Sequence, residues 1–494
     1  MNDINVEKQQ IIAIKSADQL NHAGRRLDCP FSIGLEYDEH ALTCISILRN
    51  LPGKRLVAFA NWQGQPVIAK IFYHRARAHL HAYREQNGNQ ALSESNVLTP
   101  TILYAGQDSS KSLYVLIFSY VQPKVQLNAV WEDPKHVDWS GLTKNIVEIT
   151  AKLHQSGLLQ NDPHPNNFLW GESGIYTLDT GDMEITKHRL SLPRRISFRS
   201  LGNLFAQIRP AGSEHLFEFY ETYANARNWN VTQEDYQTVL VWQQYYRSER
   251  QRKIQRKVLR NSTRFMHQQN SRYTYVCQRD LYHEDLSHFF QNPTPTLESG
   301  EVLDNQDGLL KARVDMAGRS CLLVRYKASN ILRSMRYRFM GSPAKKAWCV
   351  AQFLKSYGVN TAQPIAVMEK HSDLFCSESY YVCDYIEGDS FAVYMQKHSL
   401  ESLVSDPIVQ QVIDLFMLMR QLNISHQALS PEAILVGYGN VYLSRLDHVT
   451  IHRDVVSAKQ SLYDTYQTFI QSWKSQPDIF QFLLEKFQQH PIWM

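Results

Sequence analysis

The chain has 494 residues and a mass of 57.4 kDa, which is more than one hydrophobic core usually organises, so we expect two domains. Hydrophobic residues make up 43% of the sequence and charged residues 20%, an ordinary composition that excludes a wholly disordered chain. The 52 Lys and Arg residues against 48 Asp and Glu give a formal charge of only +4, which argues against a surface devoted to nucleic acid. We therefore expect no nucleic-acid partner.

The cysteines and the N-terminal residues indicate the compartment. Seven scattered cysteines without a CxxC pair favour reduced, mostly buried thiols over a disulfide framework or a zinc site. The first residues lack the charged start and apolar run of a secretory signal, and no later segment is apolar over the length of a membrane span. We expect a cytoplasmic protein without a transmembrane span, which leaves peripheral contact with the inner membrane open.

The first half of the chain alternates between strand and helix signals. Residues 55–73 hold two β-rich runs around a Gly-containing turn, which predicts an antiparallel hairpin. Residues 76–95 are rich in helix formers, and the apolar run SLYVLIFSYV that follows predicts returning strands. Residues 141–157 carry apolar side chains at helical spacing and end at Gly157, as a capped helix would. The pattern is that of a small sheet-rich lobe followed by a helical one.

Two segments in the middle of the chain indicate a boundary. Residues 247–264 contain eight basic side chains and one acid, which predicts either a solvated linker helix or a surface for phosphates or anionic lipid. Residues 270–308 are polar and rich in turn-forming residues. We expect the domains to be separated there.

A weak internal repeat follows this boundary. LLVRYK (322–327) stands where VIAKIF stood, YYVCDYIEG repeats the sense of SLYVLIFSYV, and SHQALSPEAILV echoes LQNDPHPNNFLW. The repeat indicates two copies of one fold. The predicted organisation is an N-terminal extension (1–40), a first domain (41–245), a basic and polar linker (246–300) and a second domain (301–494).

The first copy carries a set of side chains suited to phosphoryl transfer. Lys70 lies in a predicted strand, Asp162 and Asn167 lie five residues apart in a proline-bearing loop, and Asp179 follows the next strand. Transfer from ATP requires a lysine on the phosphates, a carboxylate at the acceptor hydroxyl, and an amide oxygen and a second carboxylate on Mg²⁺. These four positions account for each of those groups.

The loop from His154 to Leu169, with its Asp162-Pro-His-Pro-Asn-Asn167 core, resembles the catalytic loop of protein-kinase-like enzymes that phosphorylate small molecules. Leu178-Asp179-Thr180-Gly181 resembles their metal-binding Asp-x-Gly. The resemblance implies that Lys70 contacts the phosphates of ATP and that Asp162 is the catalytic acid-base. It further implies Mg²⁺ ligands at Asn167 and Asp179, with help at the γ-phosphate from His164.

A narrower resemblance concerns the substrate. The segments VLTPTILYAG and LPRRISFRSLGNLF are similar to those of bacterial lipopolysaccharide core kinases, which phosphorylate heptose or Kdo sugars. This similarity implies an anionic glycolipid as substrate and partner. Two features depart from the family pattern, since the glycine-rich phosphate loop is nearly absent and Gln160 and Asn161 precede the catalytic Asp162.

The acid that pairs with Lys70 is not fixed by the pattern. Glu85 and Glu94 both lie on the predicted helix, and we prefer Glu85 because it lies in the middle of that helix.

The second copy lacks most of these groups. When Ile434 is aligned with Phe168, Ala428 falls opposite Asp162 and Ala433 falls opposite Asn167. Near the preceding helix, Ala347 falls opposite Glu85. Arg325 or Lys327 is expected near the place of the strand lysine, and Asp447 is expected to be the one remaining residue of a metal-ligand type. Residues 301–494 therefore resemble a pseudokinase.

We expect an α+β chain of two protein-kinase-like bilobal domains in tandem, the first an ATP- and Mg²⁺-dependent kinase of a lipopolysaccharide core sugar and the second degenerate. One alternative is a non-catalytic scaffold, which the thin phosphate loop favours. Another is an atypical kinase linked to quinone biosynthesis, which Asp162-Pro-His-Pro also resembles. An aspartic protease is disfavoured because Asp179-Thr180-Gly181 has no second copy in the chain.

Overall fold

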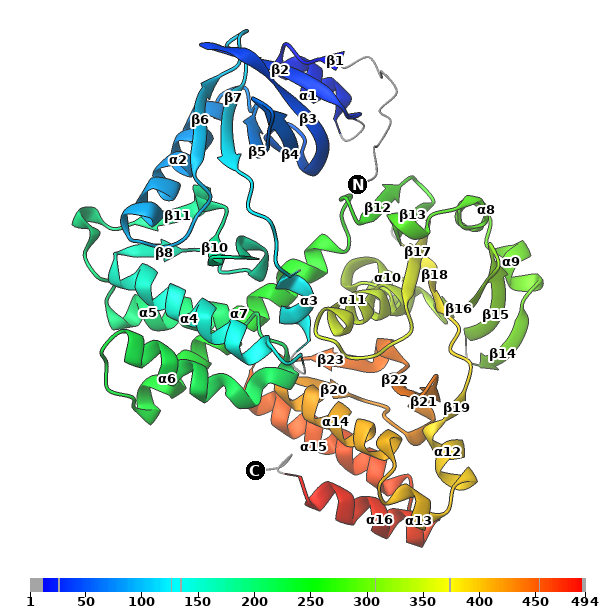
Figure 1. Cartoon of the computed structure of the whole chain (residues 1–494). Coiled ribbons are helices and arrows are strands. Elements are labelled where there is room, and N and C mark those ends of the chain that lie inside the picture. Colours follow the sequence, from blue (N-terminus) through cyan, green and yellow to red (C-terminus); the bar gives the residue numbers. More distant parts are fainter. Residues whose placement is uncertain are drawn as a thin grey trace, which may run out of the picture. The chain divides into compact units, whose positions relative to one another are not determined.

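The computed structural model describes residues 12–24, 27–125, 127–133, 136–306, 308–372, 375–452 and 454–490. The chain is a mixed α+β protein that divides into two compact units, residues 1–247 and 248–494 (Figure 1). No helix in these described ranges combines the length and apolar character that crossing a membrane requires. All seven cysteines lie in described ranges without a disulfide, and all except the half-buried Cys29 are buried, as predicted.

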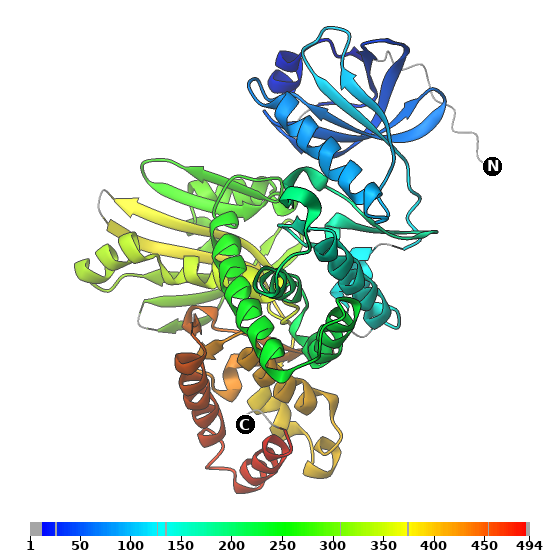
Figure 2. The same cartoon turned by 90° about the vertical axis from the view of Figure 1, so that its left-hand side faces the viewer.

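Unit 1 begins with a seven-stranded sheet in the order β1-β2-β3-β4-β5-β7-β6, and α2 lies along one face of that sheet (Figure 2). The predicted hairpin is β4 paired with β5, and its turn at Gln63 and Gly64 has positive φ at both residues, as a two-residue hairpin turn requires. The elements of this lobe are β1 (Ile12–Ala13), α1 (Ala17–Ala23), β2 (Phe31–Leu35), β3 (Asp38–Leu51), β4 (Arg55–Trp62), β5 (Gln65–Phe72), α2 (Ala78–Glu94), β6 (Ile102–Gln107) and β7 (Tyr114–Ser119).

The rest of unit 1 is mainly helical. Apolar residues of α4, among them Leu142, Ile146 and Val147, are buried against α6 in the core of this lobe. The predicted helix over 141–157 is thus confirmed as α4, and Gly157 follows it with a φ of +70°. The elements are α3 (Leu127–Glu132), α4 (Trp139–Gln155), β8 (Leu158–Gln160), β9 (Phe168–Gly171), β10 (Gly174–Thr177), β11 (Met183–Ile185), α5 (Arg194–Phe205), α6 (Leu216–Ala226) and α7 (Gln233–Lys257), which continues into unit 2.

Unit 2 has a second seven-stranded sheet, in the order β12-β13-β17-β18-β16-β15-β14, with α11 packed against it. The strands and helices of this lobe are β12 (Phe265–Gln269), β13 (Tyr273–Gln278), α8 (Glu284–Gln291), α9 (Thr294–Glu298), β14 (Glu301–Gln306), β15 (Leu309–Met316), β16 (Arg319–Lys327), α10 (Ile331–Met340), α11 (Pro343–Ser356), β17 (Pro364–Ser372) and β18 (Phe375–Asp384).

The remaining elements of unit 2 are β19 (Asp389–Ser390), α12 (Phe391–Lys397), α13 (Leu400–Leu403), α14 (Pro407–Gln421), β20 (Ile424–His426), β21 (Ile434–Gly437), β22 (Asn440–Leu443), β23 (Val449–Ile451), α15 (Val455–Gln471) and α16 (Pro477–Gln488). A large apolar core joins α14, α15 and α16 to the helix α11.

Two predicted boundaries differ from the structure. The predicted linker (246–300) contains β12 and β13, which pair with each other and with β17 and so belong to the sheet of unit 2. The predicted N-terminal extension (1–40) contains β2, which pairs with β3. In the linker, β12 (FMHQQ) is the edge strand of its sheet, where one edge remains in water, so its polar composition resembled that of a connecting segment. In the N-terminal segment, Phe31, Ile33 and Leu35 of β2 are buried in the core of the sheet.

Candidate active site

Lys70 and Glu85 form an ion pair between the sheet and the helix of unit 1. Along β5, Val67, Ala69 and Ile71 are buried in the sheet core, and the alternation of strand side chains places Lys70 on the opposite face. Glu85 is only 1% exposed in the middle of α2. The predicted pairing of Lys70 with Glu85 is confirmed, whereas Glu94 pairs with Arg189.

Asp179 lies among three cationic side chains. Its carboxylate accepts a hydrogen bond from Arg55 Nη2 at 3.0 Å, and it lies 3.7 Å from Lys70 Nζ and 3.6 Å from Arg49 Nη1. Burial by itself would raise the pKa of Asp179, but the positive charges of Lys70, Arg55 and Arg49 outweigh burial and hold that pKa below its ordinary value. Asp179 is therefore an ionised carboxylate at neutral pH.

Sequence reasoning did not identify Arg49 and Arg55. They lie on β3 and β4, on either side of the short turn that contains Gly53, where a glycine-rich phosphate loop was expected. The guanidinium of Arg55 also lies 3.6 Å from Glu85. A basic residue at each side of a degenerate phosphate loop was the available signal, because guanidinium groups can bind the phosphates that the missing glycines would have cradled.

The turn after Asp179 is joined directly to α2. The backbone N–H of Thr180 donates to Glu85 Oε1 at 3.1 Å, and the hydroxyl of Thr180 donates to the carbonyl of Glu85 at 2.7 Å. Gly88, one turn further along α2, faces the same turn, and a Cβ at this position would collide with the carbonyl oxygen of Thr180. This close approach fixes Asp179, in the left-handed backbone region at φ 53°, beside the Lys70 ion pair.

The loop that carries Asp162, His164 and Asn167 is held in shape by hydrogen bonds to its own backbone carbonyl groups. Asn167 Nδ2 donates to the carbonyl of Asp162 at 2.8 Å, and Leu178 N–H donates to the carbonyl of Asn167 at 2.7 Å. The His164 ring accepts from the N–H of Asn166 at 3.1 Å, so its contact within the loop is a turn-forming one. Asp162 is exposed, and its carboxylate is therefore accessible to an acceptor molecule.

A cavity of about 540 Å³ brings most of these residues together. Its apolar lining residues include Phe59, Ile68, Phe118 and Leu169. Its charged and amide lining residues are Arg49, Arg55, Lys70, Glu85, Asn167 and Asp179, and the Lys70 ammonium lies 5.3 Å from the centre of the Phe118 ring. Asp162 and His164 lie outside this lining set. The size and the combination of apolar and charged side chains suit a nucleotide, which presents a flat base and anionic phosphates.

The residues present fit a magnesium ion held jointly with phosphates. In the described ranges, no cluster of three or more His, Cys, Asp or Glu side chains forms a metal site by itself. Asn167 and Asp179 nevertheless line one cavity, and the amide nitrogen of Asn167 is occupied by its bond to Asp162, which leaves its oxygen as an acceptor. Mg²⁺ in phosphate sites commonly takes only one or two protein oxygens, with phosphates and water completing its shell.

Unit 2 contains a loop with the same backbone hydrogen bonds and different side chains. Ser444 N–H donates to the carbonyl of Ala433 at 3.0 Å, which matches the bond from Leu178 to Asn167. Ser430 N–H donates to the carbonyl of Ala428 at 3.1 Å, which matches the bond from His164 to Asp162. The predicted placement of Ala428 and Ala433 opposite Asp162 and Asn167 agrees with these bonds.

The expectation for Asp447 was wrong. The residue in the left-handed conformation before the second turn is Arg445, with φ 48°, and it takes the place that Asp179 holds with φ 53°. Asp447 lies two residues further on, opposite Gly181. The prediction aligned Asp447 of LDHV with Asp179 of LDTG because both are aspartates. The backbone conformations instead align Arg445 with Asp179, which is a shift of two residues. An arginine therefore stands where unit 1 has its carboxylate.

The strand residues of the second cavity also differ from the expectation. This cavity measures about 450 Å³, and the β16 side chains that line it are Leu322, Val324 and Tyr326. Arg325 and Lys327 alternate with them along a strand that pairs without a bulge, so neither takes the place of Lys70. Ala347 lines the same cavity from α11, as predicted from its alignment with Glu85.

The comparisons with known proteins are remote. No protein-family model matches the chain, and no curated protein matches it. The solved structure of WaaP in complex with acyl carrier protein is 17% identical over 46% of this chain and 91% of that chain, with a TM-score of 0.33. The BubR1 kinase domain is 16% identical over 32% of this chain and 51% of that chain, with a TM-score of 0.26. Both TM-scores lie below 0.5, so neither structure supports an argument about the function of this chain.

Proposed function

We propose that unit 1 transfers the γ-phosphoryl group of ATP, together with Mg²⁺, to a sugar hydroxyl of the bacterial lipopolysaccharide inner core. The observation that carries the phosphotransferase part is the juxtaposition of Lys70, Glu85 and Asp179 in the lining of a nucleotide-sized cavity. The acceptor sugar is proposed from the sequence resemblance to lipopolysaccharide core kinases alone.

Each side chain of the site has a role in this proposal. Glu85 holds the Lys70 ammonium in the cavity, where the ammonium contacts the phosphates of ATP. Arg49 and Arg55 neutralise the remaining phosphate charge, which in kinases is otherwise the task of glycine-rich backbone. Asn167 and Asp179 would hold Mg²⁺, which when bound draws negative charge from the phosphates.

The acceptor is handled by the exposed loop. Asp162 accepts the proton of the sugar hydroxyl as the hydroxyl oxygen bonds to the γ-phosphorus. The bond between the γ-phosphorus and the β,γ-bridging oxygen breaks, and ADP leaves with that oxygen and its electron pair. His164, two residues away on the same loop, is assigned to assist at the γ-phosphate from the sequence resemblance alone. In this proposal, unit 2 is a degenerate copy that does not transfer phosphate, because Ala428, Ala433 and Arg445 cannot serve as base and metal ligands.

Thermal unfolding with and without ATP and Mg²⁺ tests the first step. We expect ATP with Mg²⁺ to raise the melting temperature of the wild type, and Asp179→Asn to lose the part of the rise that depends on Mg²⁺. Asp182→Asn is the matched control, since Asp182 is an exposed carboxylate in the same turn that does not line the cavity. Equal magnesium-dependent shifts in Asp179→Asn and in the wild type would contradict the assignment of Asp179.

A second candidate is supported by one observation. The hydrogen bond from Arg55 Nη2 to Asp179 Oδ2 joins β4 to the turn that begins at Asp179, and this bond would break if Arg55 turned toward bound phosphates. A scaffold whose shape changes with nucleotide would use the same feature without catalysis. Transfer of labelled phosphate from ATP to dephosphorylated core glycolipid separates the two, because the scaffold binds ATP and transfers none.

A further inference from the structure

Unit 2 contains a helix that has no counterpart at the corresponding place in unit 1. In unit 1, residues 73–77 connect β5 to α2, whereas in unit 2 residues 328–342 connect β16 to α11 and form α10. The side chain of Asn330 caps α10 by accepting from the N–H of Arg333, and Ser334 is buried against the unit. α10 is thus a seated helix whose other side chains are mostly exposed.

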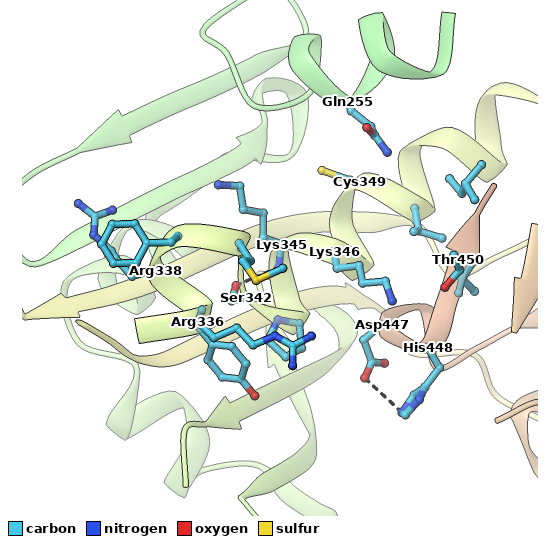
Figure 3. A pocket seen from close by; sticks show the side chains of 18 of the residues that line it. Gln255, Arg336, Arg338, Ser342, Lys345, Lys346, Cys349, Asp447, His448 and Thr450 are labelled. Atoms are coloured by element: carbon cyan, nitrogen blue, oxygen red, sulfur yellow. Dashed lines mark hydrogen bonds and ion pairs between the residues drawn. The ribbon is translucent and has the colours of Figure 1, made fainter. Parts of the chain in front are cut away.

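A cavity of about 1070 Å³ lies along α10, bounded also by α11, β23 and the last turns of α7 within unit 2 (Figure 3). Its basic lining residues are Arg333, Arg336, Arg338, Lys345 and Lys346. Among the described residues that line it, Asp447 is the one carboxylate, and its Oδ2 lies 3.4 Å from His448 Nε2. Figure 3 marks this contact with a dashed line. The lining therefore carries a large excess of positive charge.

Most of this charge is not neutralised within the protein. Arg336, Arg338 and Lys346 form no ion pair with any residue in the described ranges, and Lys345 lies 3.8 Å from Glu369. Positive charges crowded on one cavity repel one another over several ångströms, because the Debye length at physiological ionic strength is about 8 Å. An anion in the cavity would remove this repulsion, and a phosphate group would also accept the guanidinium hydrogen bonds.

Apolar side chains are exposed beside this charge. Leu332, Phe339 and Met340 line the cavity and are 78%, 69% and 76% exposed, respectively. Large apolar side chains gathered on one short helix are costly in water and mark a surface that contacts another apolar phase. A free phosphate or a sugar phosphate offers such side chains nothing to contact, whereas a lipid offers a phosphate and acyl chains at one boundary.

We propose that the α10 cavity of unit 2 binds the phosphate-bearing headgroup of an anionic membrane lipid, with Leu332, Phe339 and Met340 inserted at the apolar boundary beneath that headgroup. An anionic lipid is the occupant that complements this lining, since five basic side chains line the cavity and exposed apolar side chains line it with them. The site is independent of phosphoryl transfer, because it involves residues of unit 2 only. It would hold the chain on a membrane surface without a spanning helix.

Sedimentation of the full-length protein with vesicles tests the proposal. We expect binding to vesicles of phosphatidylcholine mixed with phosphatidylglycerol and little binding to phosphatidylcholine alone. Because each basic residue near an anionic surface contributes about fivefold to partitioning, Arg336→Gln combined with Lys346→Gln should weaken binding by about 25-fold. Phe339→Ser combined with Met340→Ser should weaken it by at least about tenfold, through loss of inserted apolar surface.

Lys459→Gln combined with Lys474→Gln is the matched control, since both lysines are exposed in unit 2, lie outside the cavity lining and form no ion pair with a described residue. This double variant removes the same amount of charge, but from positions outside the proposed headgroup site. We therefore expect its binding to remain within about twofold of wild type. Equal weakening in the Arg336/Lys346 and Lys459/Lys474 variants would overturn the proposal, because binding would then follow net charge alone.

Further outcomes separate the sources of the phosphate. A rise in melting temperature with inorganic phosphate or glycerol phosphate, without binding to anionic vesicles, would overturn the proposal in favour of a soluble ligand. Absence of both would also overturn it, and an acidic protein would become the partner to test. Activity of unit 1 is not a readout here, so failure of this proposal is distinguishable from failure of the proposed kinase reaction.

Discussion

The cavity of unit 1 and the corresponding cavity of unit 2 are framed by similar backbone and differ in charge. Unit 1 places Lys70 within ion-pair distance of both Glu85 and Asp179, whereas unit 2 places Val324, Ala347 and Arg445 along the equivalent strand, helix and turn. The loop hydrogen bonds that position Asp162 and Asn167 are retained around Ala428 and Ala433. The loop conformation is therefore encoded by turn and proline residues and does not depend on the side chains of Asp162 and Asn167.

The two units show that the conformation of the loop and the charged side chains that the loop carries are separate requirements. Pro165 and Pro431 each begin a short 3₁₀ turn, and that turn sets the direction of the strand that follows. Charged groups are needed only where phosphates and an acceptor must be bound. Unit 2 can keep the loop while its basic residues gather at a different cavity, along α10.

The largest expected effect comes from removing the proposed base. Asp162→Ala should lower phosphoryl transfer by about 10²–10⁴-fold, because a positioned general base contributes that much. The melting temperature should remain near that of the wild type, because Asp162 is exposed and its carboxylate forms no hydrogen bond to a described residue. Transfer of labelled phosphate and thermal unfolding measure the two quantities.

The reciprocal change in unit 2 serves as the control. Ala428→Asp restores the carboxylate in a loop of the same backbone, but Ala433 and Arg445 still provide no metal ligand. We expect no transfer from unit 2 when this change is made together with Asp162→Ala. Full transfer in Asp162→Ala alone would sink the mechanism, and restored transfer in the combined variant would show that the second cavity is not degenerate.

A smaller effect is expected on stability when unit 1 is given the residue of unit 2. Glu85→Ala leaves Lys70 and Arg55 with Asp179 as their remaining carboxylate, and removal of one partner from a buried ion pair costs about 3 kcal/mol. Thr180 also loses the acceptor of its backbone N–H. Urea unfolding followed by fluorescence gives the change in the free energy of unfolding.

Glu94→Ala, on the same helix, is the matched control. Glu94 pairs with Arg189 at the surface, where such pairs contribute between nothing and about 1 kcal/mol. A loss in Glu85→Ala no greater than the loss in Glu94→Ala would mean that the Lys70 ion pair does not stabilise the fold.

The sequence predicted the residues that carry local patterns and missed those that depend on three-dimensional packing. The β4–β5 hairpin, α4 and the Lys70–Glu85 pair follow from alternation, helical spacing and position within a helix, all of which are local. Arg55 approaches Asp179 only because β4 pairs with β5 and α2 contacts the turn after Asp179. The proximity of Arg55 to Asp179 could not be predicted from residue spacing, because the two residues lie far apart in the sequence.

Two further errors have physical causes. Asp447 was aligned with Asp179 by residue type, but the left-handed backbone position that defines the turn belongs to Arg445, and asparagine, aspartate or glycine would be more usual there. Strand β12 (FMHQQ) carries polar side chains because it is the edge strand of its sheet, so alternation was too weak to distinguish it from a connecting segment.

The smallest expected effect is a change in folding stability at acidic pH, which we expect for Asp179 in unit 1 and not for Arg445 in unit 2. The folded-state pKa of Asp179 is held below its ordinary value of about 4, because Lys70, Arg55 and Arg49 outweigh the effect of burial. Between these two pKa values the unfolded chain binds more protons than the folded chain. The stability contributed by ionised Asp179 is therefore fully present above about pH 4 and is lost as the pH falls through the folded-state pKa.

Urea midpoints of the wild type and of Asp179→Asn, measured from neutral pH down to about pH 3, isolate this contribution, since every other carboxylate titrates in both proteins. We expect a constant difference in midpoint above the ordinary aspartate pKa and a shrinking difference below it. Arg445→Gln gives the comparison in unit 2, where the difference should not change over this range because a guanidinium does not titrate there. A difference for Asp179→Asn that stays constant to the acid limit would show that the three cations do not stabilise its charge, and the electrostatic contrast between the two cavities would then lose its physical basis.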